Sequence, residues 1–173
     1  MEKKVLAFDF GASGGRAMCG TFDGDKISIE ELHRFSNDPV ILNGSMYWDV
    51  LRLFFEIKQG LIKAKKCGKI ESIGIDTWGV DFGLIDEEGR LLENPVHYRD
   101  ARSEGMIEES FKLIDKEKFY QITGNQFMDL NTAFQLLSLV KTRKELLEKA
   151  DKMILMPDLS LIHISEPTRH SLI

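Results

Sequence analysis

The pattern of apolar and polar positions predicts three β-strands at the start of the chain. Apolar residues dominate positions 4–10 and 16–22, and between 26 and 35 they alternate with polar residues, which is the period of a half-buried strand. The tripeptide Asp23-Gly24-Asp25 has the composition of a tight hairpin turn. We therefore expect a meander of three strands over residues 4–10, 16–22 and 26–35.

Helix and strand patterns alternate in the rest of the chain. Apolar positions at helical spacing predict a helix over 49–66, with Asp49 near its start as a cap, and 70–76 predicts a buried strand. A hairpin over 80–92 is followed by several helices, and 152–156 predicts a closing strand. This order predicts one α/β domain of the ribonuclease H-like (actin-like ATPase) class, with a mixed sheet flanked by helices.

Composition and charge exclude several kinds of partner. The 173 residues carry a formal net charge of −5, and lysine and arginine are scattered, so we expect no nucleic-acid partner. No apolar run approaches the roughly 20 residues of a membrane span, and the chain opens without a secretory signal. The two cysteines, Cys19 and Cys67, lack the spacing of a metal site. We therefore expect a cytoplasmic globular protein without a membrane partner.

A glycine-rich turn lies between the first two predicted strands. It reads Asp9-Phe10-Gly11-Ala12-Ser13-Gly14-Gly15-Arg16, and its small residues leave backbone N–H groups unshielded, as in a nest for phosphate. A carboxylate at the mouth of such a nest, here Asp9, suggests a magnesium-bound nucleotide. An ordinary hairpin explains the same composition, and no Walker or dinucleotide fingerprint is present. From these residues alone, both interpretations stay open.

A second candidate segment follows the buried strand over 70–76. Ligands collect at the carboxyl ends of strands in open α/β sheets, and here Asp76 is followed by a loop with Trp78 and Gly79. Trp78 could offer a flat face to a sugar ring, Gly79 could admit substrate to the backbone, and Asp76 and Asp81 could accept hydroxyl hydrogen bonds. Alternatively, Trp78 anchors the core and Asp81 caps neighbouring backbone.

Further polar residues have two interpretations each. Arg99, Asp100 and Arg102 precede a predicted helix and either face a polyhydroxylated ligand or form a structural ion-pair knot. We expect His97 to be a structural histidine. The stretch around His33 could contribute to a sugar pocket, although the end of a strand explains it equally well.

Taken in order over residues 4–159, these segments resemble the FGGY carbohydrate-kinase family, and 74–82 resembles its rhamnulokinase branch. The resemblance implies ATP-dependent phosphorylation of L-rhamnulose to L-rhamnulose 1-phosphate, with ATP and Mg²⁺ as cofactors. It implies the following sites: Ala12, Ser13, Gly14, Gly15 and Arg16 for the ATP phosphates, Asp9 for Mg²⁺, and Gly79 with Asp76, Thr77 and Trp78 for the sugar.

The same resemblance implies that a large part of the enzyme lies elsewhere. Family members have two lobes, so we expect residues 1–159 to be an incomplete N-terminal lobe that lacks the C-terminal lobe. The catalytic base is then expected beyond the C-terminal end, with no catalytic residue in this chain and no activity of the chain alone. Residues 160–173 resemble a translated sequencing adapter and are expected to be a non-native tail; a divergent natural terminus is the alternative.

Two other functions remain compatible with the sequence. One is another FGGY ketose kinase, such as a fuculose kinase, against which the run over 74–82 argues. The other is a nucleotide-binding module of the actin-like kind that does not turn over a sugar. A hydroxyl-rich pocket around 76–82 and 95–102 favours the sugar kinase, because a nucleotide switch has no need of one.

Overall fold

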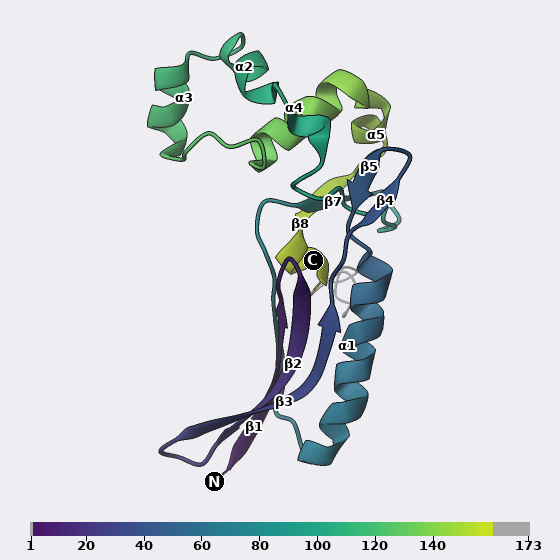
Figure 1. Ribbon diagram of the computed structural model, residues 1–173, viewed down its shortest axis with the longest axis vertical. Coiled ribbons are helices and arrows are strands. Elements are labelled where there is room, and N and C mark those ends of the chain that lie inside the picture. Colours follow the sequence, from purple (N-terminus) through teal and green to yellow (C-terminus); the bar gives the residue numbers. More distant parts are fainter. Residues whose placement is uncertain (1, 161–173) are drawn as a thin grey trace. The chain divides into compact units, whose positions relative to one another are not determined.

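The computed structural model describes residues 2–160, and Figure 1 shows their secondary structure. The chain divides into two compact units, which are described separately. The first consists of Met1–Val40, Trp48–Gly79 and Leu155–Ile173, and the second of Ile41–Tyr47 and Val80–Ile154. Residues 161–173, which make up nearly all of the expected non-native tail, lie outside the described part.

The first unit is built on a four-stranded mixed sheet. Its strands are β1 (Lys3–Phe10), β2 (Gly14–Phe22), β3 (Ile27–Ser36) and β6 (Ser72–Asp76), in the order β3-β2-β1-β6. The meander of β1, β2 and β3 is antiparallel, whereas β6 pairs with β1 in parallel. The predicted mixed sheet is therefore confirmed, and β2 begins two residues earlier than the sequence pattern indicates.

One face of this sheet packs against α1 (Val50–Ala64), which the single turn Lys65–Cys67 extends. As predicted, Asp49 caps this helix, because its side chain accepts a hydrogen bond from the Arg52 amide at 3.0 Å. Close packing requires glycine at position 60, where an added Cβ would lie 2.4 Å from the Phe8 ring. The buried residues of the two layers include Leu6, Phe8, Phe10, Ala17, Cys19, Leu53 and Ile57.

The remaining short elements of the described chain complete the two units. The first unit also holds α6 (Met156–Asp158). Two further two-stranded sheets pair β4 (Val40–Leu42) with β5 (Ser45–Tyr47), and β7 (Phe82–Ile85) with β8 (Lys152–Leu155). The β4–β5 hairpin lies between the predicted strand over 26–35 and the predicted helix over 49–66, where the sequence pattern predicts only a loop. Its three-residue strands are too short to show alternation.

Helices form most of the second unit. They are the 3₁₀ turn Ala101–Ser103, α2 (Met106–Phe111), α3 (Lys116–Thr123), α4 (Thr132–Thr142) and α5 (Lys144–Lys149). A core of Phe82, Leu84, Leu139 and Leu146 joins β7 to α4 and α5. Among the described residues, no helix is long and apolar enough to cross a membrane.

Candidate functional site

A row of four charged residues crosses one face of the four-stranded sheet. The register places Asp76 beside Asp9, Asp9 beside Arg16, and Arg16 beside Arg34. Register partners on neighbouring strands project to the same face of a sheet, and all four residues are exposed. Two carboxylates therefore lie next to two guanidinium groups, close to the carboxyl ends of β1 and β6.

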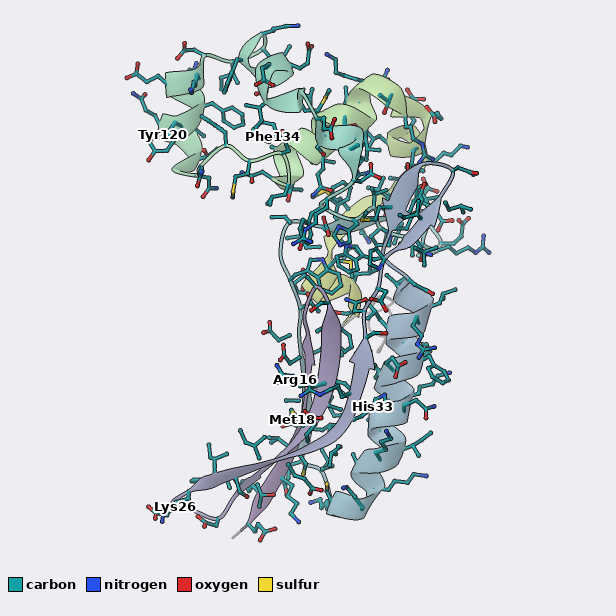
Figure 2. The ribbon with its side chains drawn as sticks, viewed as in Figure 1. Arg16, Met18, Lys26, His33, Tyr120 and Phe134 are labelled. Carbon is teal, nitrogen blue, oxygen red and sulfur yellow. The ribbon has the colours of Figure 1, made fainter. Side chains whose placement is uncertain are left out.

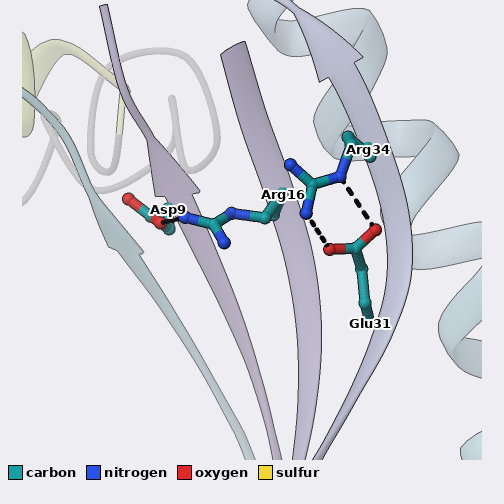
Figure 3. A network of polar contacts seen from close by, with 4 residues as sticks. All are labelled: Asp9, Arg16, Glu31 and Arg34. Carbon is teal, nitrogen blue, oxygen red and sulfur yellow. Dashed lines mark hydrogen bonds and ion pairs between the residues drawn. The ribbon is translucent and has the colours of Figure 1, made fainter.

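The two arginines of this row form ion pairs of different strength. Arg16 Nη2 donates to Asp9 Oδ2 at 2.9 Å, whereas Arg34 donates through Nε and Nη2 to Glu31 at 3.0 and 2.5 Å (Figure 3). This two-pronged contact lowers the pKa of Glu31 and raises that of Arg34. The Asp9 and Arg16 side chains are 51% and 44% exposed, and an exposed pair contributes at most about 1 kcal/mol. A ligand can therefore replace the ion pair between Asp9 and Arg16 at a small cost in free energy.

The glycine-rich turn connects β1 to β2 immediately beside this row. The Gly11 amide donates to Gly14 O at 2.9 Å and closes the turn. Asn37 donates from its main-chain N to Ser13 O at 3.2 Å and from Nδ2 to Gly11 O at 2.9 Å. Within residues 2–160, no hydrogen bond accepts the main-chain N–H of Ala12 or Ser13. The carbonyl groups of Gly11, Ser13 and Gly14 thus accept hydrogen bonds, whereas at least two amides of the turn are available.

The turn is shorter than the predicted phosphate segment. Gly14 and Gly15 already belong to β2, where Gly15 is buried and pairs with Phe10 on one side and Phe35 on the other. An added Cβ would lie 2.2 Å from the Phe35 ring at position 15 and 2.8 Å from Phe35 O at position 14. The close approach of β3 therefore gives both glycines a packing role, and their part in phosphate binding stays a prediction.

The segment after β6 combines packed and open positions. The rings of Trp78 and the fully buried Trp48 stack with centroids 4.0 Å apart, which supports the core-anchor interpretation of Trp78. Thr77 Oγ1 donates to Trp78 O at 3.1 Å. Asp76 and Gly79 are exposed, and a Cβ added at Gly79 would meet no atom within 4 Å. The packing of the described residues thus gives no reason for glycine at position 79.

A buried polar network holds Asp81 in the second unit. Asp81 is fully buried and accepts hydrogen bonds from the Tyr98 amide at 3.2 Å and from Gln135 Nε2 at 3.0 Å. Gln135, also fully buried, accepts from Arg102 Nη2 at 2.7 Å. Asp81 thus caps backbone, as the structural interpretation predicts. Gln135 was not predicted, and its one signal in the sequence is a glutamine at a buried position of a helical apolar pattern.

The loop over 95–102 is stabilised in the same way. Asp100 accepts from the Arg102 amide at 2.9 Å and from the Met46 amide at 2.7 Å. The buried His97 accepts from the Arg99 amide at Nδ1, at 2.9 Å, and so serves as an acceptor in its neutral form. Burial, with Arg99 nearby, lowers the pKa of His97 to about 4. These contacts support the structural histidine. Among the described residues no salt bridge joins Asp100 to Arg99 or Arg102, so main-chain hydrogen bonds hold the loop in place of the expected ion-pair knot.

His33 connects β3 to α1 rather than facing a pocket. Figure 2 labels His33 on β3. Its Nε2 lies 2.5 Å from Oε2 of the buried Glu56, and its Nδ1 lies 2.8 Å from Lys63 Nζ. Because the lysine can only donate, Nδ1 accepts and Nε2 carries the proton that Glu56 accepts. Arg52 also contacts Glu56, at 2.5 Å. Both the sheet and the helix therefore contribute partners to this buried carboxylate.

Comparison with known families identifies the chain. Residues 4–166 match the N-terminal domain of the FGGY family of carbohydrate kinases. The chain belongs to this family. Curated relatives include rhamnulokinases from Oceanobacillus iheyensis (43% identity, 91% of this chain), Lactiplantibacillus plantarum (44%, 90%) and Halalkalibacterium halodurans (45%, 88%). The matched segments make up 34%, 32% and 33% of those proteins, so the chain spans about a third of their length.

Solved structures support the same fold. A gluconate kinase from Lactobacillus acidophilus superposes with a TM-score of 0.75 at 16% identity, over 89% of this chain and 31% of that one. A xylulose kinase from the same organism gives 0.74 at 16% identity, over 87% and 31%. A Plasmodium falciparum glycerol kinase with ADP gives 0.66 at 21% identity, over 85% and 30%. The predicted fold class is therefore confirmed.

The charged row suits a phosphate-bound magnesium ion better than a protein cage. No cluster of three or more histidine, cysteine, aspartate or glutamate residues that could hold a metal occurs in the part of the chain that the structure describes. Mg²⁺ in nucleotide sites is usually held by one or two carboxylates, phosphate oxygens and waters. The register places Asp9 and Asp76 side by side, so these two residues could supply such carboxylates, and the neighbouring Arg16 guanidinium could pair with an anion.

Proposed function

We propose that this chain supplies the phosphate-binding turn and part of the sugar-binding surface of an ATP-dependent L-rhamnulose kinase, which forms L-rhamnulose 1-phosphate in the cytoplasm. The observation that carries the proposal is the register of Asp76, Asp9 and Arg16 beside a turn with available amides. The identity of 43–45% to three proteins named rhamnulokinase supports the choice of sugar.

The proposed roles follow from chemistry and exposure. The amides of Ala12, Ser13 and Gly14, with Arg16, would bind phosphate oxygens, and the missing side chains of Gly14 and Gly15 would let β3 approach the turn. Asp9 would hold Mg²⁺, which neutralises charge between phosphate groups. The exposed Asp76 would accept a sugar hydroxyl, Gly79 would leave room for the sugar, and Thr77 and Trp78 would shape this surface.

The proton acceptor of the reaction is proposed to lie outside these 173 residues. Phosphoryl transfer depends on positioning and on charge stabilisation from every side of the reacting group. The chain spans about a third of its curated relatives. We therefore expect the chain alone to form no ADP in the presence of L-rhamnulose, because the rest of the active site is proposed to lie in the remaining two-thirds.

A chimera tests the proposal directly. This chain would replace the matched third of the Oceanobacillus iheyensis relative, and ADP formation would be measured with L-rhamnulose, L-fuculose and D-xylulose. We expect the chimera to be active and to prefer L-rhamnulose. Asp9→Asn in the chimera should lower kcat by about 100-fold or more, since it removes an electrostatic group of the reaction; Asp38→Asn, outside the charged row, should not.

Two results would contradict the proposal. A folded chimera that phosphorylates none of the three ketoses would show that this chain cannot supply the first part of such an enzyme. Equal use of L-fuculose and L-rhamnulose would remove the sugar assignment and leave a broader ketose kinase.

A further inference from the structure

Asn37 holds the turn between β1 and β2 with both its main chain and its side chain. It directly follows β3, is only 6% exposed, and is one of the few buried polar residues in the first unit. Its Nδ2 donates to Gly11 O at 2.9 Å and its main-chain N donates to Ser13 O at 3.2 Å. A single residue thus fixes two carbonyl groups of the turn.

Fixing these carbonyls also determines where two amides point. In a trans peptide group the C=O and the following N–H lie on opposite sides of the same plane. With Gly11 O held by Asn37, the N–H of Ala12 faces away from Asn37, and with Ser13 O held, so does the N–H of Gly14. The Gly11 amide is already occupied, because it donates to Gly14 O. Asn37 thus binds two carbonyl oxygens of the turn, and the N–H groups that follow them point away from it.

We propose that Asn37 is a positioning residue that turns the Ala12 and Gly14 amides toward a phosphate group. This inference rests on the proposed function of the turn. Asparagine suits the task because its amide donates without carrying charge. An aspartate would have the same shape, but its carboxylate cannot donate to Gly11 O and would place negative charge beside an anion.

Phosphate binding by the ¹⁵N-labelled 173-residue chain tests the role. Magnesium tripolyphosphate would be titrated while the Ala12 and Gly14 amide resonances are followed by NMR. We expect saturable shifts at both amides, and a Kd about five- to tenfold higher for Asn37→Ala and Asn37→Leu, the factor that one lost hydrogen bond gives. Ser36→Ala changes the exposed neighbour and should bind as the unsubstituted chain does.

The readout separates positioning from stability. The Kd is taken from resonances of folded molecules, so it does not depend on the folded fraction, and urea unfolding gives stability independently. A lower stability with an unchanged Kd would overturn the inference. If Asn37→Ala fails to fold, Asn37→Leu decides, because it keeps nearly the same shape and the main-chain bond to Ser13 and adds no charge. No shift in the unsubstituted chain would overturn the proposed function, and this inference with it.

Discussion

Substituting Gly15 by alanine tests whether packing, rather than phosphate, requires this glycine. A Cβ at this position would lie 2.2, 2.7 and 2.9 Å from three atoms of the Phe35 ring, whereas ordinary contacts begin at 3.4 Å. The ring would have to move by more than an ångström. It cannot do so freely, because it is 9% exposed and packs edge-on against Phe10 with centroids 5.5 Å apart.

The expected magnitude is the difference of two effects. Overpacking a buried site costs about 1–3 kcal/mol. Replacing glycine by alanine restricts the unfolded chain and returns about 0.4–1 kcal/mol. Overpacking is the larger effect, so Gly15→Ala should lower the free energy of unfolding by about 1–2 kcal/mol. The Kd for magnesium tripolyphosphate of the folded molecules should stay within twofold, because Gly15 lies in β2 and outside the turn.

Urea unfolding followed by tryptophan fluorescence measures this loss. The two tryptophans of the chain, Trp48 and Trp78, lie in the same compact unit as Gly15, so their emission reports that unit. Gly74→Ala is the matched control, since a Cβ at this strand glycine would meet nothing within 4 Å. If Gly15→Ala unfolds at the same urea concentration as Gly74→Ala while its phosphate affinity falls tenfold, the packing interpretation is wrong.

Two more substitutions probe the sugar surface and the buried histidine. Gly79→Ala should change the free energy of unfolding by less than about 0.5 kcal/mol, because its Cβ would meet no atom. If the sugar approaches the backbone there, the KM of the chimera for L-rhamnulose should rise by about tenfold or more. An unchanged KM would remove Gly79 from the site. The pKa of His97 falls from 6.5 to about 4 on folding, so the unfolded chain binds the proton more readily, and stability should decrease as pH falls from 6.5 towards 4, by up to about 1.4 kcal/mol per pH unit. His97→Asn should flatten the slope measured by urea unfolding over this range, and an unaltered slope would show that another group titrates.

Local sequence patterns were sufficient to predict the helix and strands of the first unit, and they were weaker predictors of the elements in the second. The strands around residues 4–35, the helix capped by Asp49 and the strand ending at Asp76 all have clear periodicity, and each is present in the structure. The β4–β5 hairpin has strands of three residues, too short for a pattern to form. In the second unit the pattern predicts helices but not where each begins; Gly105, whose φ of 73° lies in the left-handed region, separates the turn Ala101–Ser103 from α2.

The candidate site was only partly visible in the sequence. Asp9, Arg16 and Asp76 stand out as polar residues at strand ends, but their alignment in one row depends on the register, which a one-residue slip would destroy. Arg34 and Asn37 carry no motif, since their importance arises from β3 returning beside the turn. The packing role of Gly15 was not predictable, because a sequence cannot show that an aromatic ring occupies the space of its missing side chain.

Exposure separates the polar residues of this chain into two groups with different consequences. Glu56, Asp81 and Gln135 are buried, and each has at least one partner on another element. Removing such a partner would leave a buried polar group unsatisfied, which costs about 1–3 kcal/mol. Asp9 and Arg16 are about half exposed, and their pairing contributes at most about 1 kcal/mol. A ligand can therefore displace the second kind of contact but not the first. Among the polar residues of the predicted motifs, the charged row is where binding requires the least disruption of the fold.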